Sequence, residues 1–360
     1  MERKFRFAQY GCGVVAPIII QYMVNKGAEP VAIIDRNLNR RGKMIEEVWD
    51  CGVSGIRITE PENAVKVLRE TKPDICIIAT RSSLEDVIAP FENCAKAGVS
   101  AITTSEETVF PSISNPDGAD YLDKMAKEAG VVFSASGFPD TYWGSLVTTL
   151  AGSINVVDRI KGYCIYSAYG ETLAADHGVG LSQEEFEKKF GMYNRKTPEE
   201  QLNDIRKGKL TPSNMWYQNY WLCSNIGLTV KKHMQLCRPF IAEKDVYSDE
   251  LNRRFTTGTV IGAEFTALTE TEEGPVLEST CASKVFSEDD QEYTIWEIEG
   301  EPSVSMRFDM KDANYQTCSN LINRIPDILS CKPGFVTTDK LENARYLTRP
   351  IGTYVDGVSK

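Results

Sequence analysis

The sequence predicts a two-domain α/β protein, in which a doubly wound parallel sheet is followed by an α+β domain built on a largely antiparallel sheet. Over residues 1–135, short apolar segments alternate with amphipathic helical patterns, which is typical of βαβ units. After residue 150, long β-rich stretches alternate apolar and polar residues, which indicates an antiparallel sheet with one solvated face. We therefore expect domains over residues 1–150 and 151–315, and a C-terminal segment, 316–360, that returns to the first domain.

The elements of the first domain are predicted from periodicity and from the turn residues between them. The run at 74–80 is apolar almost throughout, as expected of a strand buried on both faces of a sheet. We expect strands at 5–10, 30–34, 55–58, 74–80, 100–104 and 131–135, with helices after residue 16 and at 40–49, 64–70, 84–97 and 119–129.

The second domain is predicted in the same way. We expect strands at 160–169, 255–270, 277–286, 293–299 and 303–309, and helices at 184–190, 199–206, 214–226 and 315–329. The last helix begins the segment that is expected to return to the first domain.

A glycine-rich turn follows the first strand and reads Gly11-Cys12-Gly13-Val14-Val15-Ala16. In a Rossmann-type domain, the first glycine of G-x-G-x-x-A permits the tight turn, the second lets a pyrophosphate approach the backbone, and the small third residue allows close helix–strand packing. The free N–H groups at the helix start then face the phosphates. Asp35 ends the second strand, where a ribose diol would donate hydrogen bonds to it. The sequence therefore predicts NAD or NADP binding by Gly11, Gly13, Val14, Val15 and Asp35; the alternative is a turn that binds nothing.

The choice between the two cofactors depends on charges near Asp35. This carboxylate would repel a 2′-phosphate and so favours NAD. Arg36 follows at once, and Arg40 and Arg41 lie nearby, so guanidinium partners for that phosphate are present. The sequence favours NAD, with NADP accepted, and includes Arg36 among the cofactor-binding residues.

Composition limits the remaining functions. The 360 residues carry a net charge of −11, which argues against nucleic acid or an anionic membrane as the main partner. No apolar run is long enough to span a membrane, and the N-terminus leads directly into the first strand, without an expected signal peptide. The ten cysteines form no C-x-x-C pair, which is typical of reduced thiols in a cytoplasmic protein, and with only two histidines we expect no metal centre.

Polar residues follow the strands of the first domain, where an open α/β sheet binds its ligand. Thr80, a candidate for binding the cofactor, and the pair Glu106 and Glu107 are expected in this crevice. Adjacent carboxylates point in roughly opposite directions, so at most one faces the nicotinamide; the alternative for either is solvent exposure or an N-cap role for the helix that follows. The turn has no lysine that could take a proton from an alcohol, whereas a carboxylate suits a cationic substrate. The sequence therefore favours redox chemistry at a C–N bond.

Three further groups are candidates for binding a substrate. Phe138 and Trp143 follow the sixth strand and could form the wall of an apolar pocket, or they could be ordinary core residues. His177 lies in a glycine-rich turn and is either a polar pocket residue or a structural histidine. Tyr166 and Tyr169 are three residues apart on one strand and face opposite sides, so only one of them lines a pocket; Tyr169 is our candidate.

These residues resemble the amine dehydrogenase and 2,4-diaminopentanoate dehydrogenase family, whose N-terminal domain is similar to dihydrodipicolinate reductase. The resemblance includes the glycine turn, the double-glutamate stretch at 104–107 with 110–111, and the segments at 137–144, 177–180, 323–326 and 333–335. It implies reversible deamination of a primary amine with NAD(P), and homodimers built through the second domain. It also implies that Glu106 is the essential acid, that Phe138 and Trp143 are pocket walls, and that Asn323 lies near the cofactor.

We therefore expect an NAD(P)-dependent dehydrogenase that acts on a primary amine or diamino acid, with a carbonyl compound and ammonia as the partners of the reverse reaction. Residues 194–214 have no counterpart in the family pattern. The nearest alternative is an imine reductase of the dihydrodipicolinate reductase type, although Arg159 and Lys161 are the only strong bases between 137 and 180. A second alternative is a non-catalytic protein that senses dinucleotides.

Overall fold

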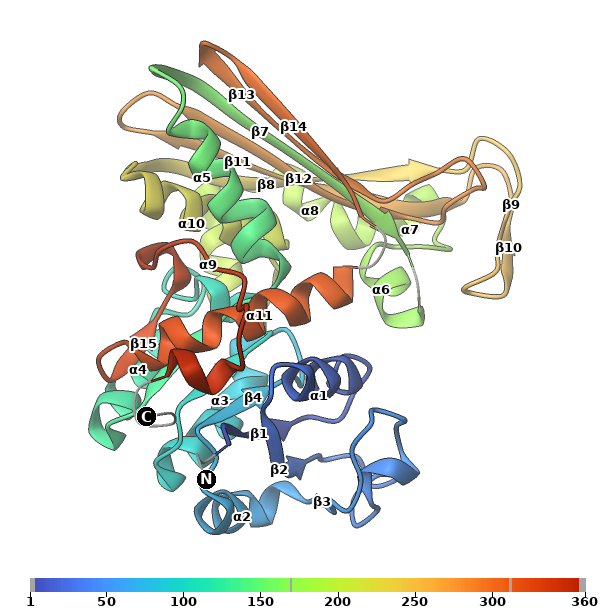
Figure 1. Cartoon of the computed structure of the whole chain (residues 1–360). Helices are drawn as coiled ribbons and strands as arrows, with labels where there is room; N and C mark the ends of the chain where they lie inside the picture. The colour runs from blue at the N-terminus through green and yellow to red at the C-terminus, as the bar shows by residue number, and fades with distance from the viewer. Residues whose placement is uncertain (1–3, 169, 311–312, 356–360) are drawn as a thin grey trace. The chain divides into compact units, whose positions relative to one another are not determined.

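The computed structural model describes residues 4–168, 170–310 and 313–355. The chain forms two compact units: residues 1–145 with 312–360 make unit 1, and residues 146–311 make unit 2 (Figure 1). Each unit has its own sheet.

Unit 1 is a seven-stranded parallel sheet in the order β15-β6-β5-β4-β1-β2-β3. The order 3-2-1-4-5-6 is that of a Rossmann fold, so the prediction of a doubly wound sheet is confirmed. Its elements are β1 (Arg6–Tyr10), α1 (Ala16–Asn25), β2 (Glu29–Ile34), β3 (Ile58–Thr59), α2 (Ala64–Thr71), β4 (Ile75–Ile78), α3 (Leu84–Ala97), β5 (Ala101–Thr103), α4 (Pro116–Ala129), β6 (Val132–Ala135), α11 (Ala313–Leu329) and β15 (Gly334–Val336).

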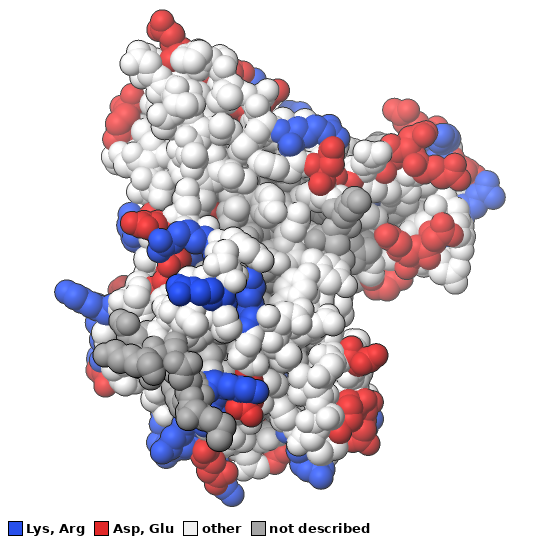
Figure 2. Space-filling model, viewed as in Figure 1, with Lys and Arg blue, Asp and Glu red and all other residues white. Residues whose placement is uncertain are grey.

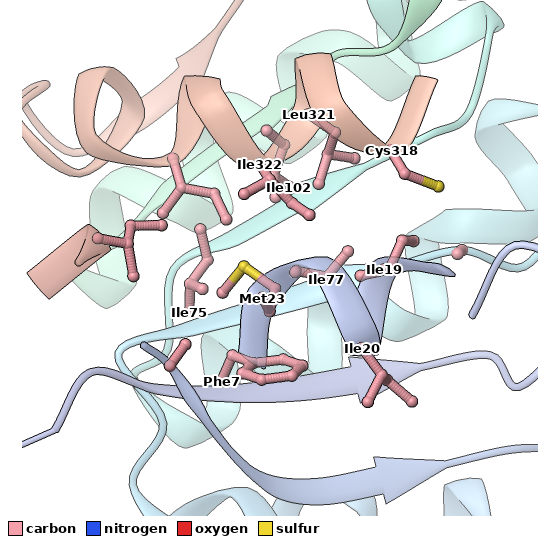
Figure 3. Packing of buried hydrophobic residues seen from close by; sticks show 14 of the residues in the cluster. Phe7, Ile19, Ile20, Met23, Ile75, Ile77, Ile102, Cys318, Leu321 and Ile322 are labelled. Atoms are coloured by element: carbon pink, nitrogen blue, oxygen red, sulfur yellow. The ribbon is translucent and has the colours of Figure 1, made fainter. Parts of the chain in front are cut away.

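Two apolar layers hold this sheet between helices. On one face, the helices α1 and α11 pack against strand residues such as Phe7, Ile77 and Ile102, and Figure 3 shows Ile19 and Leu321 in this layer. The residues of the other layer come from the strands and from α2, α3 and α4. Because both faces are covered, the strands are apolar almost throughout.

Unit 2 is a six-stranded sheet in the order β14-β13-β7-β12-β11-β8. Only the β7–β12 pair runs parallel among these neighbours, as expected of a largely antiparallel sheet. The elements are α5 (Leu146–Ala151), β7 (Val156–Ser167), α6 (Glu171–Asp176), α7 (Gln183–Phe190), α8 (Met192–Arg195), α9 (Pro198–Arg206), α10 (Asn214–Ile226), β8 (Val230–Ile241), β9 (Val246–Ser248), β10 (Arg253–Phe255), β11 (Val260–Thr271), β12 (Val276–Lys284), β13 (Tyr293–Glu301) and β14 (Val304–Asp309).

The two faces of the unit 2 sheet differ. Helices α7, α8 and α10 lie along one face in Figure 1, and none of the described helices of unit 2 lies along the other. Burial alternates accordingly: in β11, Phe265 and Ala267 are buried, whereas Thr266 and Leu268 on the other face are partly exposed. We call the face without helices the open face.

Residues 194–214 also have a place in this unit. They include the end of α8 and all of α9, and they bind the edge strand β8: Asn194 exchanges two hydrogen bonds with the backbone of Cys237, and Gln201 does the same with Gln235. This segment therefore covers part of the sheet.

Candidate functional site

The turn between β1 and α1 has the backbone geometry of a phosphate-binding loop. Gly11 has φ +90°, and a Cβ there would lie 2.3 Å from the carbonyl oxygen of Ala79, so only glycine fits. A Cβ at Gly13 would meet no atom within 4 Å, so the backbone is open at this point. In the described part of the chain, the N–H groups of residues 13–15 bond to no acceptor. These groups precede α1 and are available to an anion.

Asp35 is bound to this same turn. Its Oδ2 accepts the N–H of Cys12 at 2.5 Å, and its Oδ1 accepts the N–H of Asn37 at 2.6 Å. Nη1 of Arg40 lies 3.4 Å from Oδ2. The guanidinium beside Asp35 is therefore that of Arg40, whereas the side chain of Arg36 is exposed.

Two unpaired oxygens in unit 1 belong to predicted cofactor-binding residues. Thr80 follows β4, and its Oγ1 is buried; Asn323 lies on α11, and its Oδ1 is buried. Neither oxygen has a hydrogen-bond partner among the described residues. A buried polar atom without a partner costs about 1–3 kcal/mol. Both atoms are therefore suited to a ligand or a bound water.

The two glutamates after β5 have different environments in the structure. Glu107 is an internal cap: its Oε2 accepts the N–H of Leu84, the first residue of α3, at 2.8 Å, and its Oε1 accepts the hydroxyl of Ser114 at 2.7 Å. Both of its oxygens therefore have structural partners. The partly exposed Glu106 remains the candidate catalytic carboxylate of this loop.

A chain of side-chain bonds fixes the backbone on both sides of Glu106. Thr103 Oγ1 donates to the carbonyl of Ile78 at 2.9 Å and accepts the N–H of Ser105 at 3.1 Å. The Ser105 hydroxyl donates to the carbonyl of Ser82 at 2.8 Å and accepts from Thr108 Oγ1 at 2.7 Å. The loop therefore holds Glu106 at a defined place at the carboxyl edge of the sheet.

The segment after β6 carries a cluster of aromatic rings. Phe138 and Trp143 are 5% and 4% exposed, and their ring centroids are 5.5 Å apart in an edge-to-face arrangement. Tyr142 stacks on Phe138 at 4.4 Å. The indole N–H of Trp143 is buried and has no hydrogen-bond partner among the described residues. The two predicted pocket residues thus lie together in unit 1.

His177 lies in unit 2 within a second aromatic cluster. The centroid of its ring is 6.0 Å from that of Tyr166 and 5.6 Å from that of Phe265. Burial lowers its pKa, and its Nδ1 lies 3.0 Å from the carbonyl oxygen of Leu173. Tyr169 lies outside the described residues. Tyr166, which the sequence left as an alternative, is the tyrosine that the structure places beside His177.

The two strong bases between residues 137 and 180 are paired with glutamates. Arg159 lies 3.6 Å from Glu278, and Lys161 lies 2.5 Å from Glu299 on the open face. On the side seen in Figure 2, acidic and basic side chains are interspersed over both units.

No described helix is long and apolar enough to cross a membrane. Within the described ranges, no group of three or more His, Cys, Asp or Glu could hold a metal ion.

Comparisons with known proteins agree with this arrangement. The 2,4-diaminopentanoate dehydrogenase of Acetoanaerobium sticklandii is 26% identical over 125 residues, an alignment that covers 34% of this chain and 35% of that relative. The amine dehydrogenase from Mycobacterium smegmatis is 30% identical, with a TM-score of 0.82 over 96% of this chain and 98% of its own. The WlbA dehydrogenase from Bordetella pertussis, solved with NADH and UDP-GlcNAcA, is 16% identical, with a TM-score of 0.50 over 85% of this chain and 79% of its own. This likeness shows that the fold is shared and no more.

A family model supplies the last comparison. Residues 143–354 match the model described as the 2,4-diaminopentanoate dehydrogenase C-terminal domain, which is more than half of the chain and includes the segment 194–214. Together with the near-complete likeness to a solved amine dehydrogenase, this match shows that the chain belongs to the family of 2,4-diaminopentanoate and amine dehydrogenases.

Proposed function

We propose that this protein catalyses the reversible NAD(P)-dependent oxidative deamination of a primary amine or a diamino acid, and the reductive amination of a carbonyl compound with ammonia in the opposite direction. The observation that carries the proposal is the division of roles after β5. Glu107 caps α3 and bonds to Ser114, while the bonds of Thr103 and Ser105 hold the partly exposed Glu106 at the carboxyl edge of the sheet, where a substrate is expected. The family membership of the chain agrees with this chemistry.

The residues of the glycine turn fit a dinucleotide. We assign the pyrophosphate to the N–H groups of residues 13–15, the ribose to Asp35, and further cofactor contacts to Thr80 and Asn323. When bound, the cofactor supplies the nicotinamide that accepts or returns a hydride. Asp35 favours NAD, and Arg40 offsets the carboxylate charge, so we expect NADP to be accepted as well.

The proposed chemistry of this chain depends on one negative charge. As a carboxylate, Glu106 attracts a cationic amine, which releases one proton to solvent before the hydride leaves. The same charge then stabilises the iminium ion that remains, and Glu106 accepts a proton from the water that adds to the iminium carbon. We retain Phe138 and Trp143 of unit 1, and His177 and Tyr169 from the other part of the chain, as substrate-binding candidates.

A direct assay tests the proposal. The purified protein is mixed with NAD or NADP at alkaline pH, and the absorbance of the reduced cofactor is followed with simple alkyl amines and diamino acids. We expect growth of the signal with an amine and none with the matching alcohol. Cofactor binding without turnover over the whole panel would contradict the proposal and favour an imine reductase or a dinucleotide sensor. No observation on the described residues favours either alternative: Arg159 and Lys161 are paired with glutamates.

The role of Glu106 is tested by a matched pair of variants. Glu106→Gln is expected to lower kcat about 10²-fold or more, the effect of losing a general base, with little change in the dissociation constant of NAD. Glu107→Gln makes the same chemical change one residue away and is expected to leave kcat much closer to that of the wild type. Equal turnover in wild type and Glu106→Gln would remove this residue from the mechanism.

We also propose that the enzyme is a cytoplasmic homodimer. The cysteines of the described chain are free thiols, which agrees with a reducing compartment. The open face of the unit 2 sheet is the surface through which two copies would associate.

A further inference from the structure

A buried ion pair joins α11 to the segment after β6. The side chains of Arg324 and Asp140 are 0% exposed, and they form two parallel bonds, Nε to Oδ2 at 2.7 Å and Nη2 to Oδ1 at 2.9 Å. The hydroxyl of Ser136 also donates to Asp140 Oδ2 at 2.7 Å. Nη1 of Arg324 donates to the carbonyl of Glu342 and lies 3.4 Å from Asp327. Such complete pairing is the condition under which buried charges are tolerated, and it fixes their geometry.

Two other side chains of α11 bind the backbone of the same segment. Thr317, Asn320 and Arg324 are three and four residues apart, so they lie on one face of the helix. Thr317 Oγ1 accepts the N–H of Phe138 at 3.3 Å, and Asn320 Nδ2 donates to the carbonyl of Gly137 at 3.1 Å. This face of α11 thus holds the segment at three successive points, of which Asp140 is the last.

The segment that α11 holds has an uncommon backbone. Residues Pro139–Ser145 are π-helical, with hydrogen bonds between residues five apart. In an α-helix, residues five apart are separated by about 140° around the axis, so Phe138 and Trp143 would diverge. Here their rings meet, and Tyr142 stacks on Phe138. The π-helical turn therefore assembles the aromatic cluster, while Asp140 of the same turn bonds to Arg324.

We propose that Arg324 is a positioning residue for the substrate, which acts through Asp140 by holding the π-helical turn that presents Phe138 and Trp143. The inference rests on the proposed function, in which these two rings contact the amine. An uncommon backbone conformation persists only when its surroundings determine it. The ion pair and the bonds of Thr317 and Asn320 fix this conformation, and they join residues that are 179 to 184 apart in sequence.

Arg324→Lys tests the proposal, because lysine keeps the charge and loses the two-pronged bond. We expect the KM for the preferred amine to rise about 10-fold or more, since small displacements of positioning groups are costly. The dissociation constant of NAD, measured separately, is expected to stay within about twofold, and the ratio of kcat/KM between a small and a bulky amine is expected to change. Asp140→Asn should give the same shifts, and the double variant should be little worse than either single one.

Leu68→Ala is the control for a merely structural role. It removes buried volume from the apolar layer formed with α2, α3 and α4, away from α11. We expect it to lower the melting temperature while keeping the wild-type ratio between small and bulky amines. The proposal is overturned if the folded Arg324→Lys enzyme keeps the wild-type KM and ratio, or if Leu68→Ala shifts them equally. If Arg324→Lys does not fold, Asn320→Leu removes a single bond to Gly137 and should shift the ratio in the same direction.

A wild-type protein that oxidises no amine would refute the proposed function but would still leave the positioning role open to test. The exposure of Trp143 is then measured by the quenching of tryptophan fluorescence with acrylamide. The contribution of Trp143 is obtained by subtracting the signal of the same protein with the substitution Trp143→Phe. We expect quenching of Trp143 to increase in the Arg324→Lys background. Unchanged quenching would show that Arg324 does not hold the turn.

Discussion

His233 is fully buried in unit 2, where burial lowers its pKa to about 3. Its Nδ1 lies 2.7 Å from Thr269 Oγ1, and the rings of Trp216 and Tyr220 enclose it at 4.9 and 4.5 Å. In the unfolded chain its pKa is about 6.5, so the unfolded state binds the proton more tightly. The stability that this histidine contributes is therefore present above about pH 6.5 and decreases by up to about 1.4 kcal/mol per pH unit as the pH falls toward 3.

His233→Gln is expected to flatten this dependence. The variant loses stability at pH 7.5, because the packing changes, but between pH 6.5 and 5 its free energy of unfolding should decrease less than that of the wild type. Urea denaturation at several pH values measures the difference. Parallel curves for the two proteins would show that His233 does not titrate between the folded and unfolded states.

Single residues were predictable where their partners are close in sequence. Gly11 and Asp35 belong to a local pattern of strand, turn and strand, and the structure places both at the same turn. The role of Glu107 was not predictable, because it depends on Leu84, 23 residues earlier in another loop. Arg324 was hidden for the same reason, since its partner lies 184 residues away. The contact of Tyr166 with His177 was partly predictable. Residues of strand β7 alternate between the two faces of the sheet, and this alternation places Tyr166 on the face that the helices cover.

At the level of elements, Glu107 ties the loop after β5 to the start of α3. A carboxylate there stabilises the helix N-terminus through a charge-assisted bond and through the helix dipole. Glu107→Gln is expected to lower the free energy of unfolding by about 1–2 kcal/mol. Glu106→Gln leaves the two bonds of Glu107 in place and is expected to lower it less. Thermal melts of the two variants test this order, and a larger loss for Glu106→Gln would contradict the assignment of the cap.

Helix ends were predictable where they carry a cap. The expected helices at 84–97 and 214–226 coincide with α3 and α10. Ser83 accepts the N–H of Asp86 at the start of α3, and Gly98 ends it with φ +71°. The helix expected at 40–49 was wrong: Gly42 has φ +75°, and only Ile45–Glu47 forms a single 3₁₀ turn. The long strand β8 was missed, because its lysines, arginine and proline mask the alternation of an edge strand.

At the level of the molecule, the sequence predicted both classes of sheet but not how the strands pair. The order of the first sheet follows from right-handed βαβ connections, each of which is short in sequence. The parallel pair β7–β12 joins segments more than a hundred residues apart, and β15 joins β6 across the whole second unit. Periodicity identifies such strands, but it carries no information about distant partners.

The open face of unit 2 has an uncharged row between its charged residues. One row of paired residues crosses the sheet from β13 to β8 and contains Ile295, Tyr163, Thr280, Thr266 and Leu236. None of the five is charged, and Thr280 is only 8% exposed. A long sheet with one uncovered face can pack against a second sheet, and a second copy of the chain offers the same uncharged row under twofold symmetry.

The double variant Tyr163→Arg/Thr266→Arg tests this dimer at the centre of the row. In a twofold interface, the new charges of one copy lie close to those of the other, so association is opposed by repulsion and by the cost of burying unpaired guanidinium groups. We expect the wild type to have a mass of about 80 kDa by light scattering, twice that of one chain. The variant is expected to have the 40.2 kDa mass of a single chain with an unchanged circular dichroism spectrum. Tyr247→Arg, a matched change at an exposed tyrosine of β9, should remain dimeric. A wild-type monomer at micromolar concentration, or a double variant that stays dimeric, would exclude the open face as the interface.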